Sequence, residues 1–79
     1  MSVRILFFGA TAAAAGKREI SVEPGEISKV AGISDLVLRD HPLLKDCNLL
    51  FSLNQEYAGL DSYIKDGDEL AIFTPVSGG

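Results

Sequence analysis

The chain has 79 residues, of which 47% are hydrophobic and 23% charged, and its mean hydropathy is +0.22. This composition predicts one small globular domain and excludes a disordered polypeptide. No apolar run approaches the roughly 20 residues of a membrane-spanning helix. We expect a cytoplasmic protein without a signal peptide, because a strand-like segment follows Met1 almost at once and the one cysteine, Cys47, cannot form an internal disulfide.

The formal net charge of −4 is unevenly distributed. Residues 1–55 carry six acidic and six basic side chains, whereas residues 56–79 carry five acidic side chains and only Lys65. An acidic surface argues against nucleic acid as a partner, because phosphate neutralisation dominates such binding. It favours encounter with a basic protein surface, although a solvated acidic face that only aids solubility is an equally good explanation.

The first half of the chain predicts two strands with a short helical turn between them. Val3–Phe8 is rich in strand formers, and alternation places its odd-numbered residues on one face and its even-numbered residues on the other. Residues 11–15 are alanine-rich and lie between two glycines, which predicts a helical turn. A second strand is expected over 18–22, because Pro24-Gly25 is a strong turn signal.

The main helix is expected to begin at Ser34, which can cap its N-terminus, with Asp35 in the first turn. Gly32 is expected before this helix, and residues 27–30 as a separate short lead-in. Pro42 should stop the helix near His41, because a proline disfavours helical backbone in the residue before it.

The second half predicts a strand over 49–53, a short strand around Tyr57 after a turn at 54–56, a 3₁₀-like segment at Tyr63-Ile64, and a last strand over 69–73. This order predicts an α+β fold, a mixed sheet with one main helix packed across one face. The β-grasp fold, in which the first and last strands are parallel neighbours, is such an arrangement.

Three aromatic residues are expected on the face of the sheet opposite the helix. Alternation puts Phe8 with Arg4, and Phe73 with Glu69, away from the inward residues of each strand. Tyr57 can extend the same surface. An exposed apolar patch of this kind often marks a partner-binding site, although single surface aromatics are common.

Other chemical motifs are weak. Gly9–Lys17 has six residues between its glycines and is followed by Arg18, so it does not match the phosphate-binding P-loop. His41 and Cys47 lack the neighbours that a metal site or a nucleophile–base pair requires. The acidic residues at 66–69 are better explained by a tight turn, and no metal site is expected.

The sequence ends in Gly78-Gly79, and we expect residues 1–73 to form the domain and residues 74–79 an extended tail. Thr74-Pro75 favours extended backbone, so the six residues can reach roughly 20 Å from the domain. In this tail Pro75, Val76 and Ser77 are candidate partner contacts. Two glycines make a thin thread that can enter a narrow active site with a reactive carboxylate at its tip, although a frayed end has the same appearance.

These residues resemble the small, sulfur-carrying subunits of molybdopterin synthase, a ubiquitin-like family. The resemblance rests on the C-terminal block DGDELAIFTPVSGG (Asp66–Gly79), on Val3–Phe8 and on the turn Asn54–Tyr57. It covers nearly the full length. Thr74 stands where the family often has proline, and Ser28–Ile33 is an unusual lead-in to the helix.

The resemblance implies a ubiquitin-like β-grasp fold and a sulfur-carrier function. An activating enzyme would use ATP and magnesium to adenylate the carboxylate of Gly79, with Gly78 beside it, and a sulfur donor would convert it to a thiocarboxylate. Within a heterotetrameric synthase, the tail would donate sulfur to cyclic pyranopterin monophosphate in the large subunit. Phe8, Tyr57 and Phe73 match partner-contacting positions. The chain would hold no permanent cofactor and would not catalyse alone, since the acid–base groups belong to the partner.

The sequence leaves three alternatives open. A sulfur carrier of the same fold can instead serve thiazole synthesis, tRNA thiolation or cysteine synthesis. A ubiquitin-like modifier would form isopeptide conjugates with lysines. A plain binding domain would use no acyl chemistry and would tolerate removal of Gly78-Gly79.

Overall fold

The computed structural model of the chain describes residues 2–75. The predictions made for Val76, Ser77, Gly78 and Gly79 therefore lie outside the described residues. In chain order the elements are β1 (Val3–Phe7), α1 (Ala10–Ala15), β2 (Glu19–Val22), α2 (Val30–Asp40), the 3₁₀ helix η1 (Pro42–Asp46), β3 (Leu50–Leu53), β4 (Glu56–Ala58) and β5 (Glu69–Phe73).

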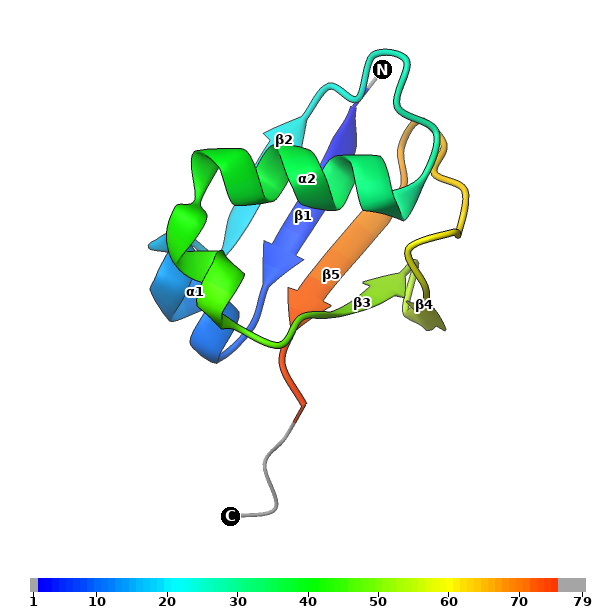
Figure 1. Ribbon diagram of the computed structural model, residues 1–79. Helices are drawn as coiled ribbons and strands as arrows, with labels where there is room; N and C mark the ends of the chain where they lie inside the picture. Colours follow the sequence, from blue (N-terminus) through cyan, green and yellow to red (C-terminus); the bar gives the residue numbers. More distant parts are fainter. Residues whose placement is uncertain (1, 76–79) are drawn as a thin grey trace.

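The strands of residues 2–75 form one mixed five-stranded sheet in the order β2-β1-β5-β3-β4. Strands β1 and β5 pair in parallel, and the other neighbours pair antiparallel. Figure 1 shows helix α2 lying across one face of this sheet, with β1 and β5 side by side at its centre. The predicted α+β class and the parallel pairing of the first and last strands are both confirmed.

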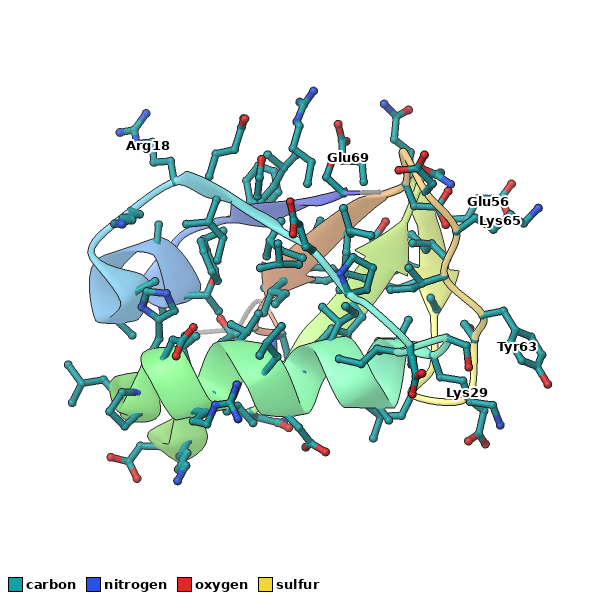
Figure 2. All side chains as sticks on the ribbon, turned by 90° about the horizontal axis from the view of Figure 1, so that it is seen from above. Arg18, Lys29, Glu56, Tyr63, Lys65 and Glu69 are labelled. Carbon is teal, nitrogen blue, oxygen red and sulfur yellow. The ribbon has the colours of Figure 1, made fainter. Side chains whose placement is uncertain are left out.

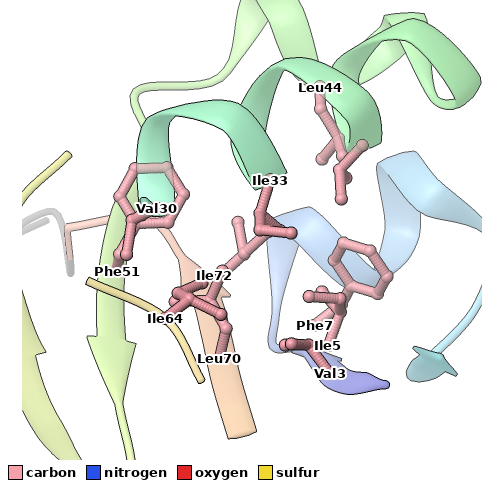
Figure 3. Close-up of a cluster of buried hydrophobic side chains, with 11 residues drawn as sticks. Val3, Ile5, Phe7, Val30, Ile33, Leu44, Phe51, Ile64, Leu70 and Ile72 are labelled. Atoms are coloured by element: carbon pink, nitrogen blue, oxygen red, sulfur yellow. The ribbon is translucent and has the colours of Figure 1, made fainter. Parts of the chain in front are cut away.

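The hydrophobic core lies between helix α2 and the face of the sheet that it covers. Strand β1 follows the predicted alternation, because Val3, Ile5 and Phe7 are buried while Arg4 is exposed. Figure 3 shows these side chains facing Ile33 of the helix. The buried hydrophobic residues of the described chain are Val3, Ile5, Phe7, Val30, Ile33, Val37, Leu44, Phe51, Ile64, Leu70 and Ile72.

Helix α2 begins one turn earlier than the sequence indicated. It starts at Val30, so Ser34 is a buried residue inside the helix rather than its N-cap, and Gly32 also lies within it. The backbone N–H groups of Val30 and Ala31 donate to the carbonyls of Ser62 and Leu60, each at 2.9 Å. The loop after β4 thus satisfies amides that a capping side chain would otherwise serve.

The end of helix α2 agrees with the prediction. The helix ends at Asp40, His41 occupies the C-cap position, and Pro42 begins η1. The ring of His41 packs edge-on against Phe7, with the ring centroids 5.9 Å apart. His41 therefore terminates the helix and covers one end of the core.

The segment Tyr63-Ile64 is not the 3₁₀ turn that was expected. Tyr63 instead forms an isolated antiparallel bridge with Lys29, and the N–H of Ile64 donates to the carbonyl of Ser28 at 2.8 Å. Pairing with the residues that precede α2 draws this loop into an extended form. It also buries the side chain of Ile64 in the core.

Candidate docking face and tail root

The outer face of the sheet, the face away from helix α2, carries one row of aligned residues across four strands. Leu6 of β1 pairs with Ala71 of β5, Ala71 pairs with Ser52 of β3, and Ser52 pairs with Tyr57 of β4. The two central side chains are small, whereas Leu6 and Tyr57 at the ends are large. The centre of the row is therefore hollow.

Aromatic side chains surround this hollow. Tyr57 is 85% exposed and Phe8 52% exposed, and the ring of Phe73 lies 5.9 Å from that of Tyr57, centroid to centroid. The hollow has a volume of about 400 Å³. Its lining residues are Leu6, Phe8, Ser52, Gln55, Tyr57, Glu69, Ala71 and Phe73. We call the apolar members Leu6, Phe8, Tyr57, Ala71 and Phe73 the outer-face patch.

A second hollow continues from the outer-face patch to the point where the chain leaves β5. It is lined by Phe8 and Gly9 on one side and by Phe73, Thr74 and Pro75 on the other. We call Thr74 and Pro75 the tail root. Gly9 has φ 57° and ψ −123°, a backbone conformation that residues with a Cβ atom avoid. This glycine allows the chain to turn sharply from β1 into α1 beside the tail root.

Charged residues occupy the other end of the outer face. The guanidinium of Arg4 lies 3.0 Å from the carboxylate of Glu69 and 3.5 Å from that of Glu19. Figure 2 shows Glu69 on the side of the sheet opposite helix α2. These exposed ion pairs contribute little to stability. One end of the outer face is therefore polar and carries paired charges. This end lies at the start of β5, whereas the tail root follows the end of that strand.

The turn before β5 contains the one carboxylate with a clearly shifted acidity among the described residues. The side-chain amide of Asn54 donates to Asp68 at 2.9 Å, and the backbone N–H of Lys65 donates to it at 2.7 Å. The bond from Asn54, followed by that from the Lys65 amide, lowers the pKa of Asp68. Both bonds favour the ionised carboxylate.

The structure brings together the aromatic residues that alternation had placed on one face. Phe8, Tyr57 and Phe73 line one hollow, and Pro75 follows directly in the next. Leu50, 36% exposed, pairs with Phe73 on the same face and was not singled out from the sequence. Ala71 and Ser52 were also missed, because a small residue gives no signal until the register of the strands shows what lies beside it.

Two other classes of site receive no support within residues 2–75. This part of the chain holds no group of three or more His, Cys, Asp or Glu side chains arranged to bind a metal ion. No helix of the described segment is both long and apolar enough to cross a membrane. Cys47 is half-buried.

The mixed sheet, with parallel central strands and a helix across one face, defines the ubiquitin-like β-grasp class, and solved β-grasp structures superpose on it closely. SAMP1, the small archaeal modifier protein 1 of Haloferax volcanii, has a TM-score of 0.88 and is 30% identical, with 100% of both chains covered. A structure of the BexX/CysO complex of Amycolatopsis orientalis contains a chain with a TM-score of 0.73 and 27% identity, covering 98% of this chain and 99% of that one.

Residues 5–79 match the ThiS family, and the chain belongs to that family. The resemblance to sulfur-carrying subunits of molybdopterin synthase is confirmed as well. The molybdopterin synthase sulfur carrier subunit of Chlamydomonas reinhardtii is 35% identical over the full length of both chains.

Proposed function

We propose that this chain is a sulfur carrier of molybdenum cofactor biosynthesis that acts as the small subunit of molybdopterin synthase. The observation that carries this proposal is the continuity of the outer-face patch with the tail root, since Phe8 and Phe73 line both hollows. A protein that binds the patch is thereby positioned beside the start of the C-terminal segment. Similarity to the synthase sulfur carrier subunits supports this branch of the family.

The proposed chemistry takes place at the carboxylate of Gly79. A carboxylate is a poor acyl electrophile, so it first attacks the α-phosphate of ATP and forms an acyl-adenylate with release of pyrophosphate. A persulfide sulfur then displaces AMP, and cleavage of the resulting S–S bond by a thiol releases the thiocarboxylate. The thiocarboxylate sulfur is the nucleophile that attacks cyclic pyranopterin monophosphate. Hydrolysis of the bond between this sulfur and the Gly79 carbonyl carbon then leaves the sulfur on the pterin product and restores the carboxylate.

The partners follow from this sequence of steps. ATP and magnesium belong to an adenylating enzyme, a persulfide-bearing protein supplies the sulfur, and the large subunit of the synthase supplies the substrate pocket and acid–base groups. Two small subunits on a dimer of large subunits form the proposed heterotetramer. All of these steps are placed in the cytoplasm. The outer-face patch serves as the docking surface, because partly exposed aromatic residues are frequent anchors of protein interfaces.

The experiment that tests this function is intact-mass measurement after incubation with the adenylating enzyme, ATP, magnesium and a sulfur source. We expect a mass gain equal to the replacement of one oxygen by one sulfur, located at Gly79 by fragmentation. Addition of the large subunit and cyclic pyranopterin monophosphate should reverse that gain. An unchanged mass with an enzyme proven active on another carrier would refute the proposal.

A matched variant tests the role of the terminus. One alanine added after Gly79 moves the carboxylate away from its expected position and leaves residues 2–75 unchanged. We expect the circular dichroism spectrum and melting temperature of the native chain, together with loss of sulfur transfer. Transfer at the native rate by an untrimmed extended chain would contradict the proposed chemistry.

A second candidate function is supported by the similarity to the small archaeal modifier protein of Haloferax volcanii. In that case the activated Gly79 would form an isopeptide bond with lysines of other proteins. Immunoblots of cells that produce a tagged chain distinguish the two functions. Conjugates of higher mass that disappear when Gly79 is deleted would favour the modifier, whereas a free thiocarboxylate favours the carrier.

A further inference from the structure

Thr11 is a polar side chain buried at the junction of β1, α1 and β5. Its side chain is fully buried, and it is one of two buried polar residues in the described chain, the other being Ser34. A buried hydroxyl costs free energy unless it is hydrogen-bonded. The bonds that Thr11 makes therefore indicate what this residue holds in place.

The Thr11 hydroxyl connects the backbone of β5 to that of Phe8, the residue that follows β1. Its oxygen accepts a hydrogen bond from the N–H of Phe8 at 3.0 Å. It lies 2.7 Å from the carbonyl oxygen of Ile72 and 2.9 Å from that of Phe8. Because a hydroxyl has one proton, it donates to one carbonyl at a time, and the shorter distance favours Ile72.

The carbonyl of Ile72 is the last group through which β1 holds the final strand. The parallel register of β1 with β5 ends at the pair Phe7–Ile72, and the N–H of Phe8 reaches the Ile72 carbonyl only at 3.3 Å. The bond from Thr11 is the shorter of the two. After Ile72 come Phe73, which belongs to the outer-face patch, and then the tail root.

We propose that Thr11 is a positioning residue that sets the direction in which the chain leaves β5 toward its C-terminal segment. The hydroxyl holds the Ile72 carbonyl three residues before Pro75, so a small rotation there is magnified with each residue that follows. The inference rests on the proposed function, because the direction matters only if a partner receives the C-terminus. Misplacement of a reacting group by about 1 Å can cost on the order of 100-fold in rate.

The test compares Thr11→Val, which has nearly the same shape and no hydroxyl, with Thr11→Ser, which keeps the hydroxyl. In Thr11→Val we expect the Phe8 N–H to shift fully onto the Ile72 carbonyl, which moves the end of β5. Ile33→Val, a core change under helix α2, is the matched control for a general loss of stability, and all three variants are assayed well below their melting temperatures.

Two measurements are made on each variant. The first is the amide chemical shift and hydrogen exchange of Phe73 and Thr74 by nuclear magnetic resonance, which requires no enzyme. The second is the steady-state rate of adenylation with the chain as the varied substrate. We expect Thr11→Val to move the amide signals of Phe73 and Thr74 and to lower kcat about tenfold. KM should change less than kcat, because every side chain of the outer-face patch is retained. Thr11→Ser should restore kcat, and Ile33→Val should change neither kcat nor the amide signals of Phe73 and Thr74.

The outcomes separate this inference from the proposed function. Native kcat in Thr11→Val, or a loss equal to that of Ile33→Val, overturns the positioning role while the carrier function stands. If the native chain is not adenylated at all, the proposed function fails, and the amide measurements decide the inference alone. Unmoved amide signals of Phe73 and Thr74 would then overturn it, and displaced signals restored by Thr11→Ser would support it.

Discussion

The two faces of the sheet are built from the same strands but differ in what covers them. On β5 the side chains of Leu70 and Ile72 are fully buried beneath helix α2, whereas those of Ala71 and Phe73 are only partly buried on the outer face. One face of each strand thus stabilises the fold, and the other holds a hollow rimmed by aromatic rings. Stability and the proposed docking are therefore separable by single substitutions on neighbouring residues.

The outer face is hollow because the residues at its centre are small, although large side chains stand at its edges. Ala71 and Ser52 occupy the middle of a row whose ends are Leu6 and Tyr57. In the inner layer the corresponding space is filled by the side chains of α2. Within residues 2–75 no helix lies over the outer-face patch, so its apolar side chains remain available to another protein.

The largest expected effect comes from truncating adjacent residues of β1. Ile5 is fully buried, and Ile5→Ala should lower the free energy of unfolding by about 2–5 kcal/mol, because it removes apolar contacts and leaves a cavity. Leu6→Ala on the outer face opens no closed cavity and should cost about 1 kcal/mol. Urea unfolding measures the free energy of unfolding of both variants. Equal losses would show that the two faces of β1 contribute equally to stability, which contradicts the comparison.

The next effect concerns binding. Phe73→Glu places a charge in the outer-face patch and should weaken binding to the proposed large subunit by at least about tenfold, or about 1.4 kcal/mol. Leu43→Glu is the control, because Leu43 is 67% exposed on η1, outside the patch. Calorimetry gives both affinities. An equal loss in the two variants would point to a general charge effect and not to the patch.

An effect of comparable size is expected at Gly9, where the chain turns from β1 into α1. At φ 57° and ψ −123°, Gly9 adopts a backbone conformation that alanine strongly disfavours, so Gly9→Ala should destabilise the fold by about 1–3 kcal/mol. Gly59 is the matched control. A Cβ atom added at either glycine meets nothing within 4 Å, but only Gly9 of the two has a positive φ. Gly59→Ala should therefore be nearly neutral in thermal unfolding, and a similar loss in both would exclude backbone strain as the cause.

The smallest expected effect is a pH dependence of folding stability, which arises from Asp68 in the turn before β5. The folded-state pKa of Asp68 is lowered, so its contribution to stability is complete above the unfolded pKa of about 3.9 and is lost as pH falls through the lower folded value. The urea midpoint of the native chain should fall in that acidic window. Asp68→Asn should reduce this fall, whereas Asp61→Asn, at an exposed turn, should leave it in place.

Local sequence patterns predicted the strands well and the start of the main helix poorly. Alternation correctly separated Phe8 and Phe73 from the inward residues of their strands, and the turn at Asn54-Gln55 forms a tight hairpin with positive φ at both residues. Helix α2 begins at Val30 because the carbonyls of Ser62 and Leu60 accept its first amide bonds. Those carbonyls are about 30 residues away in the chain, so no local capping signal reveals them.

Gly32 is a second residue whose position could not be predicted from local sequence patterns. The sequence places this glycine before the helix, but it lies in the first turn of α2, where the side chain of Ile27 packs against it. A Cβ atom at this position would lie 2.6 Å from the Cγ2 atom of Ile27. The need for a small residue arises from a contact that only the folded chain makes.

The sequence by itself determined the class of fold, the two faces of β1 and β5 and the resemblance of the chain to sulfur carriers, because these depend on period-2 alternation and on contiguous motifs. Only the tertiary structure decided which residues meet across strands. Strand register created the hollow at Ala71 and Ser52, and the packing of α1 against β5 brought the Thr11 hydroxyl to the Ile72 carbonyl. Both are contacts between distant segments, which follow from how the strands pair and pack and not from local preference.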